Sequence, residues 1–97
     1  MNLKILSSAL NDLHEGRLFY ERQGEGVGEY FFDAVYADID SLALYAGNHL
    51  KTFGFYRMLA KRFPFAIYYK MEDPKNVIVF RVLDLRQHPQ KTLRALK

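Results

Sequence analysis

The side chains of this sequence that could do chemistry are mostly cations, concentrated in its second half. Residues 1–46 contain three basic and eight acidic side chains, a net charge of −5, whereas residues 47–97 contain eleven basic and three acidic ones, a net charge of +8. Such a charge pattern favours binding to an anion, either a nucleic acid or an acidic protein segment. We therefore expect partner-binding residues among Lys61, Arg62, Arg81 and Arg86, unless these cations are only solvated surface.

Other reactive side chains do not form a recognisable catalytic or metal-binding pattern. His14, His49 and His88 lack the spacing of metal ligands, and Ser41 lacks the surrounding glycines of a catalytic serine turn. The glycine-rich stretch 24–28 resembles a phosphate-binding loop, but such loops follow a strand and this one follows a predicted helix. We interpret it as a turn between two helices, and we expect no metal and no cofactor.

Length and composition indicate one domain over residues 1–97. With 49% hydrophobic residues and no cysteine, the chain should fold by burial alone in a reducing compartment, most simply the cytoplasm. The first ten residues lack the apolar core of a signal peptide, and no run approaches the roughly 20 apolar residues of a membrane span. The sequence thus predicts a soluble protein without membrane contact.

The basic residues must be positioned by strands. The stretch 62–70 is rich in aromatic and branched residues and reads as a central strand that starts at Pro64, because proline cannot donate to a sheet. Similar runs at 55–60 and 76–86 flank it through short connections, which predicts a three-stranded antiparallel meander.

The first half predicts a strand and two helices. Residues 2–7 alternate like a short strand, Ser7 or Ser8 can cap a helix that ends near Gln23, and a second helix spans 27–46 with Gly47 as its cap. The two helices should form an antiparallel hairpin on one side of the sheet. Their predicted apolar stripes are Leu6, Leu10, Leu13, Arg17 and Tyr20, widened by Ala9 and Leu18, and then Phe31, Val35, Ile39, Leu42 and Ala46.

Strand alternation predicts which side chains share a face of the sheet. Residues 48–54 read as a loop, after which Arg57 lies on one face with Phe55 and Leu59. In the last strand Ile78, Phe80, Val82, Asp84 and Arg86 share one face, and Val77, Val79, Arg81, Leu83 and Leu85 the other. Arg57 and Arg86 could then share a face, with His88 two residues beyond. Pro89 ends the strand, and residues 90–97 form either a short basic helix or a frayed tail.

The predicted fold class is α+β: an N-terminal strand and an antiparallel two-helix hairpin, packed on a mainly antiparallel sheet that the C-terminal meander completes. This order of elements, with its motifs, resembles the RelE/ParE superfamily of type II toxin–antitoxin toxins, and most of all its ParE-like, plasmid-stabilisation branch. The motifs are Asp12-Leu13 with Tyr20, Asp38 to Leu42, Lys61 to Tyr69, and Leu83 to Pro89.

The resemblance implies a growth-inhibiting toxin that is neutralised by a cognate antitoxin, whose disordered acidic arm folds over the toxin. Such an arm would bury apolar side chains and pair its carboxylates with the basic sheet, offset by its ordering cost. ParE-like relatives are inhibitors of DNA gyrase that trap a topoisomerase–DNA complex without chemistry of their own. Gyrase binding is therefore the first expectation.

A ribosome-dependent mRNA endoribonuclease of the RelE type is the second expectation. Such cleavage needs a base, an acid and cations around the phosphorane. The resemblance would place Arg57, Arg86 and His88 in that site, but Ala66 and Leu59 stand where ribonuclease relatives have an arginine and a lysine.

Two further alternatives stay open, so that the sequence does not decide whether the chain is an enzyme. The chain could be an inactive toxin homologue that only binds. The cations could also be structural, with Arg57 paired to Asp84 or a helix acid, Arg86 bound to a backbone carbonyl and His88 exposed before Pro89.

Overall fold

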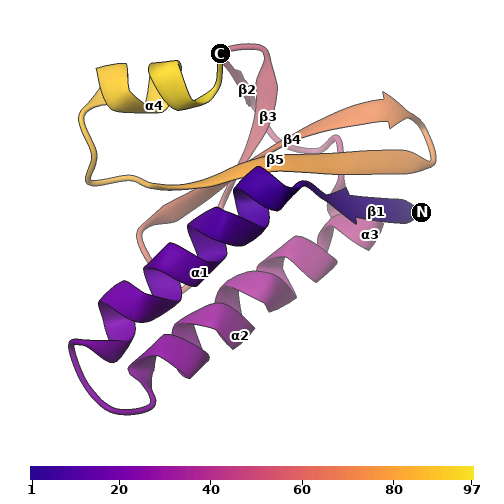
Figure 1. The fold of residues 1–97 in the computed structure, drawn as a ribbon. Helices are drawn as coiled ribbons and strands as arrows, with labels where there is room; N and C mark the ends of the chain where they lie inside the picture. Colours follow the sequence, from indigo (N-terminus) through magenta and orange to yellow (C-terminus); the bar gives the residue numbers. More distant parts are fainter.

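The computed structural model describes residues 1–97 as a mixed five-stranded sheet with helices on both faces (Figure 1). The strand order is β1-β5-β4-β3-β2, in which β1 (Asn2–Ile5) runs parallel to β5 (Asn76–Asp84) and all other neighbours are antiparallel. A helical hairpin covers one face, and α4 (Pro89–Ala95) lies over the other. The predicted fold class is confirmed.

Strand β4 (Phe65–Asp73) is the central strand, as its sequence predicted. Its first five residues are all buried, because the strand has neighbours on both edges and helices on both faces. It follows β3 (Phe55–Leu59) and precedes β5 through a two-residue turn. The Asp73 carboxylate holds that turn by accepting a hydrogen bond of 2.8 Å from the Lys75 N–H.

The helical hairpin consists of α1 (Ser7–Glu21) and α2 (Val27–Asp40), and the glycine-rich stretch between them is the predicted helix–helix turn. The Glu21 carboxylate accepts hydrogen bonds from the N–H groups of Gly26 and Gly28, at 3.1 and 3.0 Å. It thereby satisfies free donors in the first turn of α2 and places negative charge at the positive end of that helix. Gly26 has a φ of +83°, which explains a glycine there.

The apolar stripe predicted for α1 is confirmed only at Ala9, Leu13 and Tyr20. The residues of α1 that are buried are Ala9, Asp12, Leu13 and Gly16, whereas Leu10 and Leu18 remain almost half exposed. The helix is rotated because it must present a carboxylate to the sheet and a glycine to α2. The stripe predicted for α2 is confirmed, since Phe31, Val35, Ile39 and Leu42 are fully buried and Ala46 packs against them.

Two apolar cores lie on opposite faces of the sheet. The larger one fills the space between the helical hairpin and the sheet and is centred on Phe31, Tyr69 and Val79. The smaller one consists of Phe55, Ala66, Tyr68 and Leu83, packed under Ala95 and Leu96 at the end of α4. Residues 90–97, left undecided by the sequence, therefore include a helix that covers the second face. None of the helices is long and apolar enough to cross a membrane.

The second predicted helix is interrupted. It ends at Asp40 and is followed by a single turn, α3 (Leu42–Tyr45). The Ser41 hydroxyl donates to the Asp38 carbonyl at 2.6 Å, a local bond that competes with the helical pattern. Gly47 follows with a φ of +90°, as expected for the residue after a helix end.

The predicted loop 48–54 contains a short strand, and the predicted serine cap is absent. Strand β2 (Lys51–Thr52) pairs with the first two residues of β3 at the edge of the sheet. At the start of α1 the cap position is Leu6, without a side-chain cap, and the Ser8 hydroxyl instead donates to the Phe80 carbonyl at 2.7 Å.

The faces predicted for the last strand are wrong beyond Val79. Tyr68 pairs with Arg81 but Tyr69 pairs with Val79, so that Phe80 is an extra residue, a β-bulge. Val79 and Val82 consequently both lie in the larger core, although simple alternation places them on opposite faces.

Candidate binding surface

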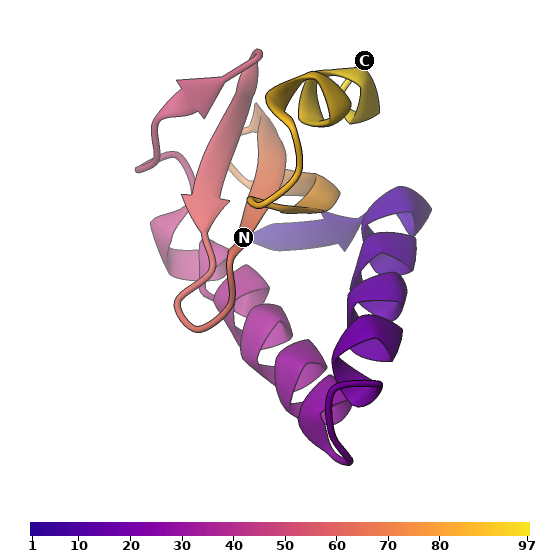
Figure 2. The same cartoon turned by 90° about the vertical axis from the view of Figure 1, so that its left-hand side faces the viewer.

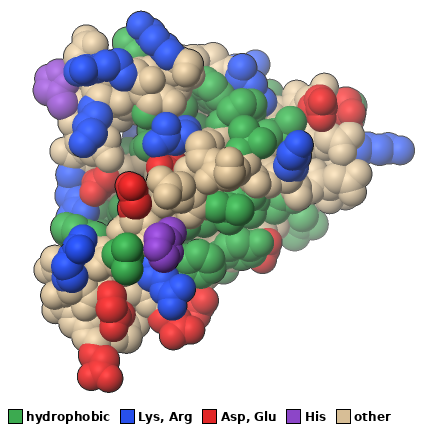
Figure 3. All heavy atoms as spheres, viewed as in Figure 1, with side chains coloured by type: hydrophobic (Ala, Val, Ile, Leu, Met, Phe, Trp, Pro, Cys, Tyr) green, Lys and Arg blue, Asp and Glu red, His purple; other side chains and the backbone are tan.

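Charge is separated along the molecule as the sequence predicted. In Figure 3 the side chains over α4 are mainly basic, whereas those at the far end of the α1–α2 hairpin are acidic. The predicted partner-binding cations do not form one cluster, however. Two are held by carboxylates of the same chain, Arg81 by Asp12 and Arg86 by Asp84, and no others form ion pairs.

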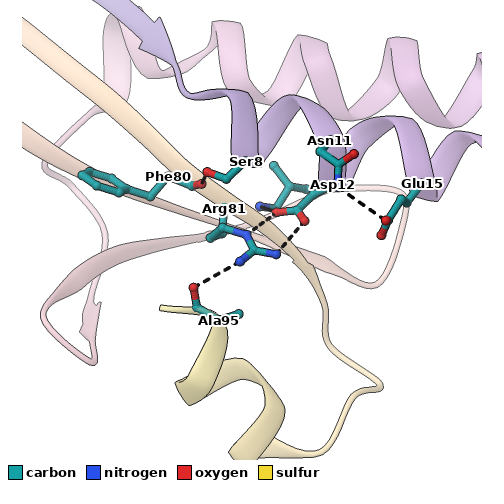
Figure 4. Close-up of polar contacts among 8 residues, drawn as sticks. Ser8, Asn11, Asp12, Glu15, Phe80, Arg81 and Ala95 are labelled. Carbon is teal, nitrogen blue, oxygen red and sulfur yellow. Dashed lines mark hydrogen bonds and ion pairs between the residues drawn. The ribbon is translucent and has the colours of Figure 1, made fainter. Parts of the chain in front are cut away.

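Arg81 joins α1, β5 and α4. Its Nε and Nη2 donate to the Asp12 carboxylate at 2.7 and 2.8 Å, and its Nη1 donates to the Ala95 carbonyl at 3.1 Å (Figure 4). Asp12 also accepts the Val82 N–H at 2.9 Å, so it occupies the edge of β5 beyond the end of β1. The carboxylate raises the pKa of Arg81. This guanidinium is thus already engaged within the fold.

Arg86 lies past the end of β5, on the side of the sheet covered by α1. It donates to both oxygens of Asp84, at 2.9 and 2.7 Å, and its guanidinium lies 5.6 Å from the centre of the Phe19 ring. The pair lowers the pKa of Asp84 and raises that of Arg86. About half of the Arg86 side chain stays exposed, so its charge still contributes to the surface.

Arg57 lies on the opposite face from Arg86, so the expectation of a shared face is wrong. Its Nε donates to the Tyr68 hydroxyl at 3.3 Å, and Tyr68 belongs to the core under α4. His88 caps α4 by accepting the Gln90 N–H on Nδ1 at 3.1 Å. Arg57 lines a small pocket with residues near His88, but neither His88 nor Arg86 lines it. The three residues of the ribonuclease alternative are therefore not gathered in one pocket.

Four cations without an ion pair, Lys51, Arg57, Lys61 and Arg62, lie around the edge of the sheet formed by β2 and β3. Lys51, Arg57 and Lys61 all line one groove of about 590 Å³, so the groove is basic. Arg62 is exposed in the turn that follows β3. This groove, rather than the sheet as a whole, is the candidate binding surface.

Two buried acids, Asp12 and Asp38, were not assigned a role from the sequence. Asp12 and Asp38 are only 8% and 7% exposed. Asp38, near the end of α2, accepts the Lys61 N–H at 3.0 Å and so holds the turn after β3. A carboxylate beside an apolar helix stripe is the signal that could have revealed both, because buried acids are nearly always paired.

One wall of the groove is held by a tyrosine–histidine contact. The buried Tyr69 hydroxyl accepts the Gly47 N–H at 2.9 Å and lies 2.5 Å from Nδ1 of His49. In the neutral tautomer of His49 with its proton on Nε2, Nδ1 accepts the Tyr69 hydroxyl proton, and in the other tautomer Nδ1 donates to the phenol oxygen. Burial lowers the pKa of His49, consistent with that neutral form.

The stability of the fold should therefore fall as the solution becomes mildly acidic. The unfolded chain, with its ordinary histidine pKa of about 6.5, takes up a proton before the folded chain does. The contribution of neutral His49 to the free energy of unfolding is fully present above the pKa of the unfolded chain. It is lost as pH falls toward the lower pKa of folded His49. The urea midpoint should decrease between about pH 7.5 and 5.5 in the native chain and change less in His49→Gln. Equal decreases in both would contradict this role of His49.

Solved structures confirm the class of the fold. A chain from the chromosomal ParDE toxin–antitoxin system of P. aeruginosa superposes with a TM-score of 0.73 over 89% of this chain and 97% of that one. The two sequences are only 17% identical, so this likeness shows the fold alone. No curated protein sequence matches significantly.

This α+β fold is therefore shared with a protein of that system, and the sequence identifies the family. The model of the ParE toxin of the type II toxin–antitoxin system parDE matches residues 3–89. The chain belongs to this ParE toxin family. It is a toxin of a type II system, which implies a cognate antitoxin as its partner.

Proposed function

We propose that this toxin inhibits growth by binding DNA gyrase and that it does no chemistry of its own. The main support is that the residues expected in a ribonuclease site lie apart from one another. Arg57 lies against Tyr68 on one face, and Arg86 lies against α1 and Asp84 on the other. Stabilisation of a phosphorane needs cations that converge on one point.

Two further features support binding over cleavage. Leu59 and Ala66 are a cross-strand pair, and the resemblance to RelE-type ribonucleases places both at positions where those proteins typically have cations. His88 uses Nδ1 as an acceptor in a helix cap. A gyrase inhibitor requires a complementary surface, and the unpaired cations Arg57, Lys61 and Arg62 provide basic charge for one.

The proposal predicts opposite outcomes in two assays with purified protein. DNA supercoiling by gyrase should be blocked at near-stoichiometric amounts of toxin, while ribosome-bound mRNA stays intact. Cleavage of that mRNA with gyrase unaffected would overturn the proposal, and loss of cleavage in His88→Ala or Arg86→Ala would then identify a ribonuclease.

Expression of the chain without an antitoxin provides the third comparison. We expect growth arrest, relieved by co-expression of a short acidic protein encoded beside this chain. Normal growth with soluble, folded protein in the cells would instead identify an inactive homologue. A role in plasmid stabilisation requires both results, growth arrest by the chain alone and relief of that arrest by the second protein.

A further inference from the structure

The C-terminal segment of the chain is basic without interruption. Residues 86–97 contain four basic side chains and no acidic one. Arg86 is held by Asp84, whereas Lys91, Arg94 and Lys97 form no ion pair within the chain. These three side chains are exposed. Their charge is therefore free to act on another molecule.

The three free cations lie along one face of α4. Lys91 and Arg94 are three residues apart, so they are neighbours on the surface of the helix. The turn continues to Lys97, whose N–H donates to the Arg94 carbonyl at 3.4 Å. With a rise of about 1.5 Å per residue, the three residues form a stripe of roughly 9 Å. The other side of the helix, at Ala95 and Leu96, packs on the smaller core, so the stripe faces solvent.

A fourth cation, Lys70 of β4, extends the stripe beyond the end of α4. Its Nζ lies 4.5 Å from the centre of the Phe55 ring and 5.5 Å from that of the Phe80 ring. Attraction between the ammonium group and the ring faces holds this side chain on the side of the sheet that α4 covers. Lys70 and Lys97 both line a hollow of about 490 Å³, and no acid lines it. Together these cations form one basic surface, the α4 surface, made of Lys70, Lys91, Arg94 and Lys97.

The α4 surface is polar as well as basic. None of the large apolar side chains that are exposed in this chain lies within residues 86–97. A protein interface is centred on apolar and aromatic side chains, whereas an interface with a nucleic acid is polar and strongly positive. The groove beside β3 differs in this respect, because Leu50 and Leu59 are exposed there. The chemistry of the α4 surface therefore fits a phosphate backbone better than a protein.

The negative charge of the molecule lies away from this surface. Figure 2 shows α4 at the opposite end of the molecule from the turn between α1 and α2. Acidic side chains gather at that turn, among them Glu21, Glu25 and Glu29. A polyanion is attracted by one end of such a molecule and repelled by the other. A DNA duplex would therefore approach the end that carries α4.

We propose that the α4 surface binds the phosphate backbone of double-stranded DNA without reading its sequence. Lysine and arginine contacts to phosphates position a protein on a duplex, whereas contacts to the bases read sequence. A stripe of roughly 9 Å can meet about two or three phosphates of one strand, at about 3.4 Å of helix axis for each. The inference rests on the proposed function in one respect, that this duplex is the DNA held by gyrase. The toxin would then hold the complex by its DNA as well as by its protein.

The test measures binding of the purified toxin to a fluorescein-labelled duplex of about 20 base pairs, by fluorescence anisotropy at several salt concentrations and without gyrase. Each phosphate contact contributes about −0.9 to the slope of log affinity against log salt. Lys91→Gln, Arg94→Gln and Lys97→Gln together should reduce the size of that slope by about 2 to 3. They should also weaken binding by about tenfold or more at low salt. Lys70→Gln alone should reduce the slope by about 1.

The matched control removes three cations from other parts of the chain. Arg17→Gln, Arg22→Gln and Lys75→Gln change the net charge by the same amount, and all three side chains are exposed. This variant should keep the salt dependence of the native toxin. Equal losses in the two triple variants would show that only net charge matters, and would overturn the inference. Because none of the replaced side chains is buried, the fold should be unaffected in both.

Other polyanions show whether the ligand is duplex DNA. A poly-glutamate peptide and a single-stranded RNA, each with as many charges as the duplex, should bind about threefold or more weakly, because their charges are less densely spaced. Binding of the peptide as tight as that of the duplex would identify a surface for acidic proteins. Equally tight binding of the RNA would identify an RNA surface, and either result would overturn the inference.

Inhibition of gyrase separates failure of this inference from failure of the proposed function. The triple variant in α4 should require about tenfold more toxin to block supercoiling, and the control variant should not. If the native toxin binds the duplex through the α4 surface but leaves gyrase active, the proposed function alone is rejected. If the triple variant blocks gyrase as well as the native toxin does, the inference is rejected and the proposed function stands.

Discussion

Replacement of Asp12 by alanine is expected to lower the free energy of unfolding by about 3 kcal/mol. The nearly buried carboxylate accepts three hydrogen bonds, two from Arg81 and one from the Val82 N–H. Its removal leaves a partly buried guanidinium and a buried N–H without their acceptor. Arg81 is 28% exposed, which places the estimate at the lower end for broken buried pairs. Urea denaturation followed by circular dichroism gives the value.

Asp84→Ala is the matched control, since it breaks the other ion pair of the chain. There the carboxylate and the guanidinium are 21% and 52% exposed, so solvent screens the interaction and the expected loss is about 1 kcal/mol or less. If both variants lose the same stability, Asp12 does not hold α1, β5 and α4 together as described.

Gly28→Ala is the second substitution with a large expected effect. In an ordinary helix this change would stabilise by about 1 kcal/mol. Here a Cβ atom would lie 2.4 Å from the Arg17 carbonyl oxygen and 2.9 Å from Cβ of Glu21, so α1 and α2 must move apart. We expect a net loss of about 2–3 kcal/mol, measured as a lower urea midpoint and melting temperature.

Gly24→Ala separates the effect of close helix packing from that of glycine replacement in general. A Cβ atom at Gly24 would meet only the end of the Val27 side chain, at 3.2 Å, and Gly24 does not have a positive φ. This variant should stay close to the native stability. A Gly28→Ala protein as stable as the native one would show that the two helices can separate without cost.

Local pattern in the sequence was sufficient for the order of elements and for the central strand. The run from Phe65 to Tyr69 reads as a strand because its residue types favour a buried pleated surface, whatever lies next to it. The glycine-rich turn was predictable for a similar reason, since the helix before it excluded a phosphate loop. The charge difference between the two halves also follows from sequence alone, because side-chain charges are independent of the fold.

The tertiary structure decided which of the cations remain available and on which face they lie. The bulge at Phe80 changes the faces of β5, and its extra residue is defined only by pairing with β4. Asp12 and Arg81 are 69 residues apart, so no local periodicity could reveal that one neutralises the other. The cations of α4 likewise share one exposed face only because Ala95 and Leu96 pack against the sheet. Each of these features is a relation between segments that only folding brings together, whereas the elements themselves follow from neighbouring residues.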